Sequence, residues 1–154
     1  MKHWKKYCSV VNGFEMEAAY CEKTIENIFL PLLRRLTKAQ KEQGGRLLVF
    51  AAAPPAVGKT TLCQFLEHLS REEDDLTEIQ AVGLDGFHYH SDYINSHDAV
   101  VQGKKVPMKS VKGCPETYDT QKLGEKLRQI KEEDALWPVY DRNIHDVVED
   151  AIKL

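Results

Sequence analysis

The sequence has 154 residues, of which 42% are hydrophobic and 29% charged, so it is long enough for one soluble globular domain with a buried core. Its net charge of −3 gives no electrostatic reason to expect nucleic acid or an anionic membrane as a partner. Four widely spaced cysteines and the lack of an apolar run of membrane-spanning length favour a cytoplasmic protein with reduced thiols.

The N-terminal part predicts a β-hairpin followed by an amphipathic helix. Two strand-like arms in residues 7–20 flank Asn12-Gly13, the strongest short signal for a hairpin turn. In residues 22–43, apolar side chains recur every three or four positions, as on one face of a helix. Pro31 should kink or split this helix, and Gly44-Gly45 should end it.

A buried strand, a tight loop and a helix are predicted next. The apolar run 47–52 predicts the strand, and the helix begins at about Lys59. Gly58-Lys59-Thr60 lies where the loop joins the helix, the context in which backbone N–H groups bind phosphate, a lysine reaches the outer phosphates and a hydroxyl holds Mg²⁺. The residues expected to bind nucleotide are Ala56, Val57, Gly58, Lys59, Thr60 and Thr61, with Thr60 as the metal ligand. The alternative is a Gly-Lys-Thr that only caps a helix.

The loop departs from the usual pattern at its start. That pattern opens with a glycine, where this chain has Ala53. Pro54 and Pro55 donate no N–H, so residues 57–61 must supply the donors to phosphate.

Asp85 follows a second apolar run, 79–84, which predicts the next buried strand. Ligands bind outside the carboxyl ends of the strands in an open α/β sheet, so we expect Asp85 beside the phosphate loop. There its carboxylate could accept a proton from an attacking hydroxyl or bind the metal through water. The alternative is a turn or cap residue.

The remaining segments are predicted from turn and cap signals and from apolar spacing. They are a polar, irregular stretch with a short helix near Tyr93 (91–105), a long loop of the kind that binds substrate (106–119), a helix capped by Asp119 or Thr120 (to about Glu133) and a short extended piece (136–142).

Four motifs in order resemble the P-loop kinases of the pantothenate kinase, uridine kinase and phosphoribulokinase group. They are Ala56-Val57-Gly58-Lys59-Thr60-Thr61, Leu84-Asp85-Gly86-Phe87, Lys112-Gly113-Cys114-Pro115-Glu116-Thr117-Tyr118-Asp119 and Pro138-Val139-Tyr140-Asp141-Arg142. With the hairpin, the set is most similar to a bacterial subgroup of sugar kinases, also called fructose transport system kinases.

The resemblance covers about residues 47–152. It implies an α/β P-loop NTPase fold, a three-layer sandwich with a mostly parallel sheet. Residues 46–154 would form the kinase core, and 1–45 would pack on it as hairpin and helix.

The resemblance also implies a reaction: ATP-dependent phosphorylation of a hydroxyl on a small molecule, with ATP and Mg²⁺ as cofactors. Lys59 would stabilise the β- and γ-phosphates, Asp85 would be the catalytic carboxylate, and Lys112 would lie near the transferred phosphoryl group. Tyr140 and Arg142 would contact the acceptor. We expect His88 either to contact the acceptor or to be exposed to solvent. His145 follows Arg142 and is expected to face the acceptor pocket, the alternative being a polar residue of a helix or turn. A metal site formed by His88, His90 and His97 is less favoured, because their spacing defines no ligand geometry.

Two departures from the family bear on the acceptor and on the extent of the fold. Pantothenate kinase has a histidine where this chain has Arg142, which argues against pantothenate and leaves a sugar, a nucleoside or a phosphorylated acceptor open. The next elements of the family are not found before Leu154, so we expect a fold incomplete at its C-terminus that can form a homodimer to cover apolar surface. The alternatives to a kinase are a nucleotide-binding P-loop protein without transfer activity, and an assembly or regulatory module that binds a partner.

Overall fold

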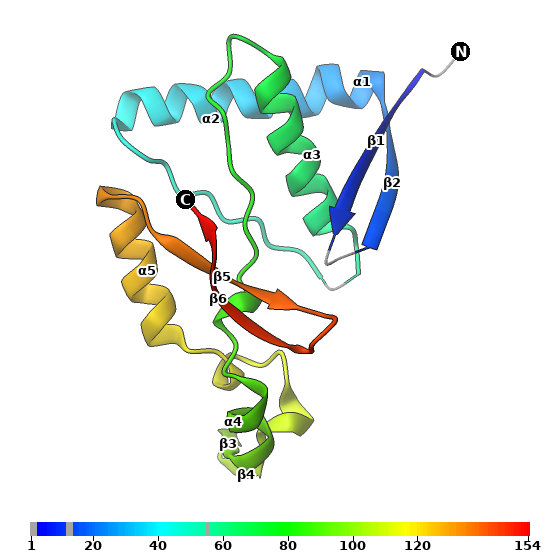
Figure 1. The fold of residues 1–154 in the computed structure, drawn as a ribbon. Coiled ribbons are helices and arrows are strands. Elements are labelled where there is room, and N and C mark those ends of the chain that lie inside the picture. Colours follow the sequence, from blue (N-terminus) through cyan, green and yellow to red (C-terminus); the bar gives the residue numbers. More distant parts are fainter. Residues whose placement is uncertain (1–2, 12–13, 55) are drawn as a thin grey trace. The chain divides into compact units, whose positions relative to one another are not determined.

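The computed structural model describes residues 3–11, 14–54 and 56–154, so the predicted turn Asn12-Gly13 and Pro55 lie outside the described residues. The chain divides into two compact units, Met1–Val82 and Gly83–Leu154. The sheets found among the described residues are three antiparallel pairs of strands (Figure 1). Within those same residues, no helix combines the length and the apolar character that a membrane crossing requires.

The predicted hairpin is confirmed by the strands β1 (Trp4–Val11) and β2 (Phe14–Cys21), which pair antiparallel with Tyr7 opposite Ala18. Along β1, the half-buried side chains of Lys5, Tyr7 and Ser9 alternate with exposed ones. This period of two places one face of the ribbon toward the protein and the other toward solvent.

The predicted helix is confirmed, and its hydrogen-bond pattern changes before Pro31 without a break in the helix. It consists of α1 (Glu22–Thr24), a π-helical turn (Ile25–Phe29) and α2 (Leu30–Gln43). Proline has no N–H to donate to the preceding turn, and the π-helical turn lies directly before it, where the Leu30 N–H bonds to the Ile25 carbonyl. Gly44 ends α2 with a positive φ of 70°, and its N–H bonds to the Gln40 carbonyl at 3.0 Å.

Helix α3 (Lys59–Glu72) forms the centre of the first unit. Its Phe65 is fully buried, with the Tyr20 ring stacked on it at 4.2 Å between centroids and the Tyr7 ring edge-on at 5.3 Å. Both tyrosines come from the hairpin, which lies beside α3 in Figure 1. Aromatic burial of this kind attaches the hairpin to the helix that begins at the phosphate loop.

The two segments predicted as buried parallel strands, 47–52 and 79–84, have no strand structure. Val49 and Phe50 of the first segment are 58% and 64% exposed. A strand inside a parallel sheet needs a hydrogen-bonded neighbour on each side, and the described residues pair no strand with either segment. A mixed α/β composition is present, whereas the mostly parallel sheet of a three-layer sandwich is not confirmed.

Side chains from two helices hold part of the second segment instead. Alternate N–H groups of an extended chain point to the same edge, and three such groups in residues 77–81 bond to side chains of α2 and α3. The pairs are Thr77 N–H with Thr37 Oγ1 at 2.9 Å, Ile79 N–H with Ser70 Oγ at 3.0 Å, and Ala81 N–H with Glu67 Oε2 at 3.0 Å. These bonds occupy one edge of the segment without any neighbouring strand.

Replacing Ser70 by alanine is expected to lower the free energy of unfolding by about 1–3 kcal/mol, because the part-buried Ile79 N–H loses its acceptor. Ser70 is itself only 3% exposed. Urea unfolding of the two proteins measures the difference. Ser9→Ala is the matched control, since the buried Ser9 hydroxyl has no hydrogen-bond partner among the described residues, and its loss should leave the free energy of unfolding unchanged or raise it. Equal effects of both substitutions would contradict this assignment.

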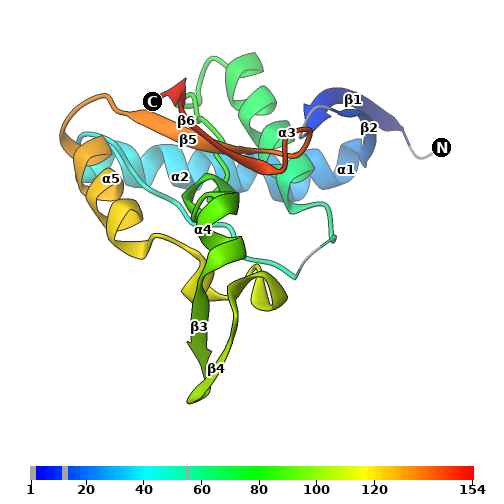
Figure 2. The ribbon, with the colours of Figure 1, turned by 60° about the horizontal axis from the view of Figure 1, so that its bottom comes forward.

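The second unit contains two hairpins and two α-helices, in the order α4 (Ser91–Ser96), β3 (Asp98–Val101), β4 (Lys104–Pro107), α5 (Thr120–Glu132), β5 (Leu136–Asp141) and β6 (Asp146–Lys153). It also contains three short 3₁₀ turns, Asp85–Phe87, Met108–Val111 and Pro115–Thr117. Figure 2 shows β3 and β4 as a narrow ribbon beyond α4. The predicted helices near Tyr93 and after Asp119 are confirmed, and the Asp119 carboxylate accepts the Lys122 N–H at 2.9 Å as the N-cap.

The prediction that residues 91–105 are irregular apart from that short helix was wrong. β3 and β4 pair across Gln102 and Gly103, whose φ angles are 51° and 76°. Two consecutive positive φ angles form the hairpin turn whose twist matches that of the strands, and Gly103 allows the second of them.

Candidate functional site

The loop before α3 has residues with positive φ angles, one of them at the helix N-cap. Gly58 is left-handed, with φ 82° and ψ 18°, and Ala56 also has a positive φ, 61°. The first described bond of the helix joins the Leu62 N–H to the Gly58 carbonyl at 2.9 Å. The N–H groups of residues 59–61 come before it and have no acceptor within the helix. They therefore lie at the positive end of the helix dipole.

This end of α3 fits a phosphate group. Ala56, Val57, Gly58, Lys59 and Thr60 are exposed, and Thr61 is half-buried. An anion here would meet backbone donors, an ammonium group and a hydroxyl, which together suit a nucleotide phosphate chain and its Mg²⁺ ion. The loop belongs to the first unit, and the other predicted site residues belong to the second.

In the second unit, Asp85 occupies a 3₁₀ turn, Asp85–Phe87, that is anchored by its neighbours. Phe87 is fully buried, with its ring edge-on to Trp137 at 4.7 Å. The Trp137 indole N–H donates to the Gly83 carbonyl at 2.9 Å. Gly86 lies against the backbone of Pro138. A buried phenylalanine and a close backbone approach thus hold the exposed Asp85 in place.

Gly86→Ala is expected to lower the free energy of unfolding by about 3 kcal/mol, because a Cβ would overlap the Pro138 carbonyl and lie 2.7 Å from the Val139 nitrogen. Gly124→Ala is the matched control in α5, where the nearest atom to a Cβ, Nη1 of Arg128, is 3.9 Å away. Alanine there should raise the free energy of unfolding by about 0.5–1 kcal/mol. Denaturant titration of both variants tests the pair, and a harmless Gly86→Ala would refute the close approach.

Side chains from three separate segments gather around this turn. The Tyr118 hydroxyl donates to Asp85 Oδ1 at 3.3 Å, and the His88 ring stacks on the Tyr118 ring at 3.7 Å between centroids. The Tyr140 ring is edge-on to His88 at 6.1 Å. Lys112 Nζ donates to the Tyr140 hydroxyl at 2.6 Å and lies 4.4 Å from its ring centroid. A carboxylate, an ammonium group and two phenols therefore belong to one connected group, which we call the Asp85 cluster.

The protonation of the cluster follows from burial. Burial lowers the pKa of His88 below its ordinary value of 6.5, although the Thr117 carbonyl and Asp85 act against it. The neutral ring donates from Nδ1 to the Thr117 carbonyl at 3.1 Å, since a carbonyl oxygen only accepts. Burial, the Asp85 charge and the Asp85 hydrogen bond raise the pKa of Tyr118 to about 12. Tyr118 therefore stays a hydrogen-bond donor at neutral and moderately alkaline pH.

The other predicted acceptor residues lie apart from these contacts. Arg142 and His145 are exposed in the turn between β5 and β6, where the His145 carbonyl accepts the Ser91 hydroxyl at 2.6 Å. The ring nitrogens of His90 lie 3.4 Å from a carboxylate oxygen of Asp146 and 3.3 Å from one of Glu149. His97 stacks on Tyr93. Over the described ranges, no three His, Cys, Asp or Glu side chains are grouped so that they could hold a metal.

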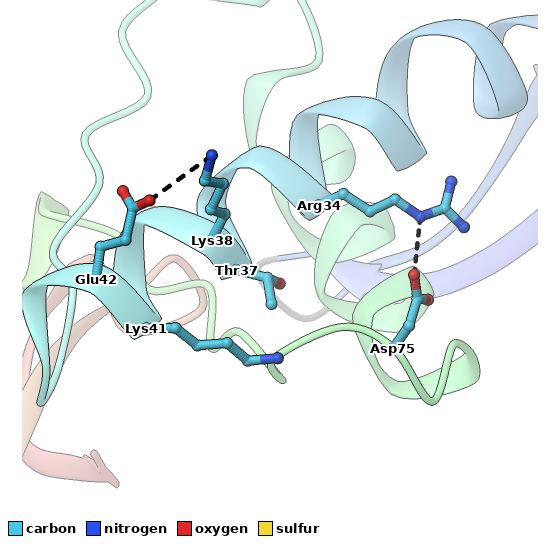
Figure 3. Close-up of a pocket in the computed structure, with 6 residues that line it drawn as sticks. All are labelled: Arg34, Thr37, Lys38, Lys41, Glu42 and Asp75. Carbon is cyan, nitrogen blue, oxygen red and sulfur yellow. Dashed lines mark hydrogen bonds and ion pairs between the residues drawn. The ribbon is translucent and has the colours of Figure 1, made fainter.

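A hollow of about 470 Å³ in the first unit does not coincide with any predicted site residue. Its lining consists of Arg34, Thr37, Lys38, Lys41, Glu42 and Asp75 (Figure 3). Arg34 is paired with Asp75 at 2.9 Å, and Lys38 with Glu42 at 3.7 Å. Exposed, paired charges of this kind are common on protein surfaces, so we take the phosphate loop of the first unit and the Asp85 cluster of the second as the two candidate sites instead.

Sequence reasoning assigned no role to Tyr118 and Thr117, which are central to the cluster. Both lie in the third motif, so their importance could have been suspected from their position. No local pattern indicates that Tyr118 meets Asp85, because 33 positions separate the two residues. Thr117 is fully buried, and its hydroxyl accepts the Gly113 N–H and donates to the Cys114 carbonyl.

The N-terminus of α3 carries a lysine and a threonine, and the Asp85 cluster combines a carboxylate with an ammonium group. Kinase-type nucleotide-binding proteins use groups of these kinds, and comparison with known proteins agrees at that level. The chain is 25% identical to the pantothenate kinase of Enterococcus faecalis over 150 residues, which are 86% of this chain and 46% of that protein. It is 28% identical to the pantothenate kinase of Bacillus subtilis over 141 residues, 79% of this chain and 41% of that protein. The chain is therefore a distant homologue of the pantothenate kinases.

A more similar relative is the uncharacterized protein YggC of Escherichia coli K12. It is 41% identical over 143 residues, which are 92% of this chain and 56% of YggC. The chain thus spans about half the length of the curated relatives it matches. No protein-family model matches the chain, and no solved structure gives a significant match.

Proposed function

We propose that the chain carries the nucleotide-binding loop and part of the acceptor site of an ATP-dependent phosphotransferase that acts on a hydroxyl of a small molecule. The observation that carries this proposal is the convergence of Asp85, Lys112 and Tyr140 from three distant segments into the Asp85 cluster. All three residues come from motifs that resemble those of a P-loop kinase group. The pantothenate kinases are distant homologues of this chain.

In this proposal the loop binds the phosphate chain of ATP. The N–H groups at the start of α3 and the Lys59 ammonium group neutralise phosphate oxygens, because phosphoryl transfer depends on positioning and charge stabilisation more than on covalent chemistry. The Thr60 hydroxyl would be the protein ligand for Mg²⁺. The ion, when bound, would neutralise charge on the phosphate oxygens.

The Asp85 cluster supplies the groups that act on the acceptor. Asp85 accepts the proton of the attacking hydroxyl, as a carboxylate can when it lies within hydrogen-bond reach. Lys112 contributes positive charge near the transferred phosphoryl group and is held by the Tyr140 hydroxyl. Tyr140 and His88 line the acceptor side, with the His88 ring neutral.

The acceptor class is proposed from Arg142. This exposed guanidinium group brings a fixed charge and a planar set of donors where the pantothenate kinase motif has a histidine. It favours a sugar, a nucleoside or an already phosphorylated acceptor over pantothenate. His145 lies in the same turn and would extend that contact surface.

The test is calorimetric titration of the protein with ATP and Mg²⁺, followed by a product screen over sugars, sugar phosphates, nucleosides and pantothenate. The proposal expects nucleotide binding and transfer to one acceptor class. Binding without transfer to any acceptor would favour a nucleotide-binding protein that is not a kinase. If ATP did not bind, both P-loop functions would be wrong and the assembly or regulatory role would remain.

A further inference from the structure

We infer that Tyr118 is a positioning residue for the proposed reaction, holding the Asp85 carboxylate in its working orientation through a hydrogen bond to Oδ1. The inference rests on the proposed function, because it gives Asp85 a role in proton transfer. The Tyr118 hydroxyl is 3.3 Å from Asp85 Oδ1, and the half-buried Tyr118 ring stacks on His88.

The local backbone explains why these side chains meet. Asp85 begins a 3₁₀ turn in which the His88 N–H bonds to the Asp85 carbonyl at 3.2 Å. Side chains three positions apart on such a turn lie nearly one above the other. His88 in turn faces Tyr118 across an antiparallel bridge, so the Tyr118 ring covers His88 and its hydroxyl reaches the residue above it.

Two backbone bonds hold the segments of this bridge together. The Tyr89 N–H donates to the Thr117 carbonyl at 3.0 Å, and the Asp119 N–H donates to the Phe87 carbonyl at 2.8 Å. Asp119 also caps α5, so the segment that carries Tyr118 is fixed on both sides. A supporting residue held this way can orient a catalytic side chain without loss of entropy at the moment of reaction.

The chemistry of the pair is complementary. The phenol stays protonated far above neutral pH, with a pKa raised to about 12 by burial and by Asp85. It therefore donates to one carboxylate oxygen throughout the working range. The proposal leaves Oδ2 to accept the proton of the acceptor hydroxyl.

The test is Tyr118→Phe, which keeps the ring on His88 and removes only the hydroxyl. We expect kcat to fall about 10-fold with the KM for ATP unchanged, as for the loss of one hydrogen bond to a charged group. Tyr89→Phe is the matched control, a half-buried tyrosine of the same unit outside the Asp85 cluster, and should leave kcat unchanged. In an Asp85→Asn background, Tyr118→Phe should have less than a two-fold further effect, because its role passes through Asp85.

A measurement that needs no activity accompanies the kinetics. The ¹³Cζ resonance of Tyr118, identified by its loss in Tyr118→Phe, should shift in Asp85→Asn and not in Asp92→Asn. A resonance indifferent to Asp85, an unchanged kcat in Tyr118→Phe, or an equal loss in the Asp85→Asn background would each overturn the inference. If Asp85→Asn shifts the resonance but the wild-type protein transfers phosphate to no acceptor, the proposed function is wrong, and the positioning role of Tyr118 in that reaction with it.

Discussion

Replacing Lys59 by alanine is expected to weaken ATP binding about 100-fold, as for the loss of charge-assisted hydrogen bonds to phosphate. Lys59 is the first residue of α3 and is exposed, next to N–H groups with no acceptor inside the helix. The remaining backbone donors would still attract phosphate, so binding should be weakened rather than abolished. Calorimetric titration with ATP and Mg²⁺ gives the two dissociation constants.

Lys41→Ala is the control for net charge, since it removes an exposed lysine of the same unit that lies in α2. Its dissociation constant for ATP should stay within two-fold of the wild-type value. If both lysine variants bound ATP equally well, the loop at residues 56–61 would not be the nucleotide site. A thermal unfolding curve for Lys59→Ala shows whether the fold is intact, which is expected for an exposed side chain.

Replacing Asp85 by asparagine is expected to lower kcat about 1000-fold while leaving ATP affinity within two-fold. An amide of the same shape cannot accept the proton of the attacking hydroxyl, and general base catalysis contributes rate factors of this order. The exposed side chain and the anchored Phe87 beneath it should keep the fold unchanged. Steady-state kinetics with the acceptor from the product screen, beside calorimetry with ATP, separate the two effects.

Asp92→Asn provides the comparison, because Asp92 is an exposed carboxylate of the same unit, on the short helix α4. It should turn over at the wild-type rate. Full turnover by Asp85→Asn would show that another group accepts the proton. A parallel loss of ATP affinity would mean that Asp85 acts in nucleotide binding.

The sequence motifs contain three residues that the structure joins in the Asp85 cluster, but they do not indicate how these residues are connected. Asp85, Lys112 and Tyr140 were selected from separate motifs, and their side chains join one cluster through His88 and Tyr118. The roles assigned to them stay predictions. Tyr118 itself escaped assignment, because a hydrogen bond across 33 positions depends on how two segments pair and not on either segment alone.

Local signals in the sequence were sufficient for the first hairpin, the helix that is perturbed near Pro31, α3, α4 and α5. Each depends on groups within a few residues: alternating apolar side chains, a missing N–H, a left-handed Gly58 or an N-cap such as Asp119.

Only the tertiary structure decided how the apolar runs 47–52 and 79–84 are used. Their composition indicates buried strands, but a strand exists only when a neighbour accepts and donates its backbone bonds, and within the described ranges none does. Side chains of Ser70 and Glu67 hold one edge of the second run instead.

The sequence by itself determined the local elements and the motif residues of this protein. The tertiary structure decided which distant backbone groups pair and that Asp85 meets Tyr118, because both depend on contacts between segments far apart in the chain.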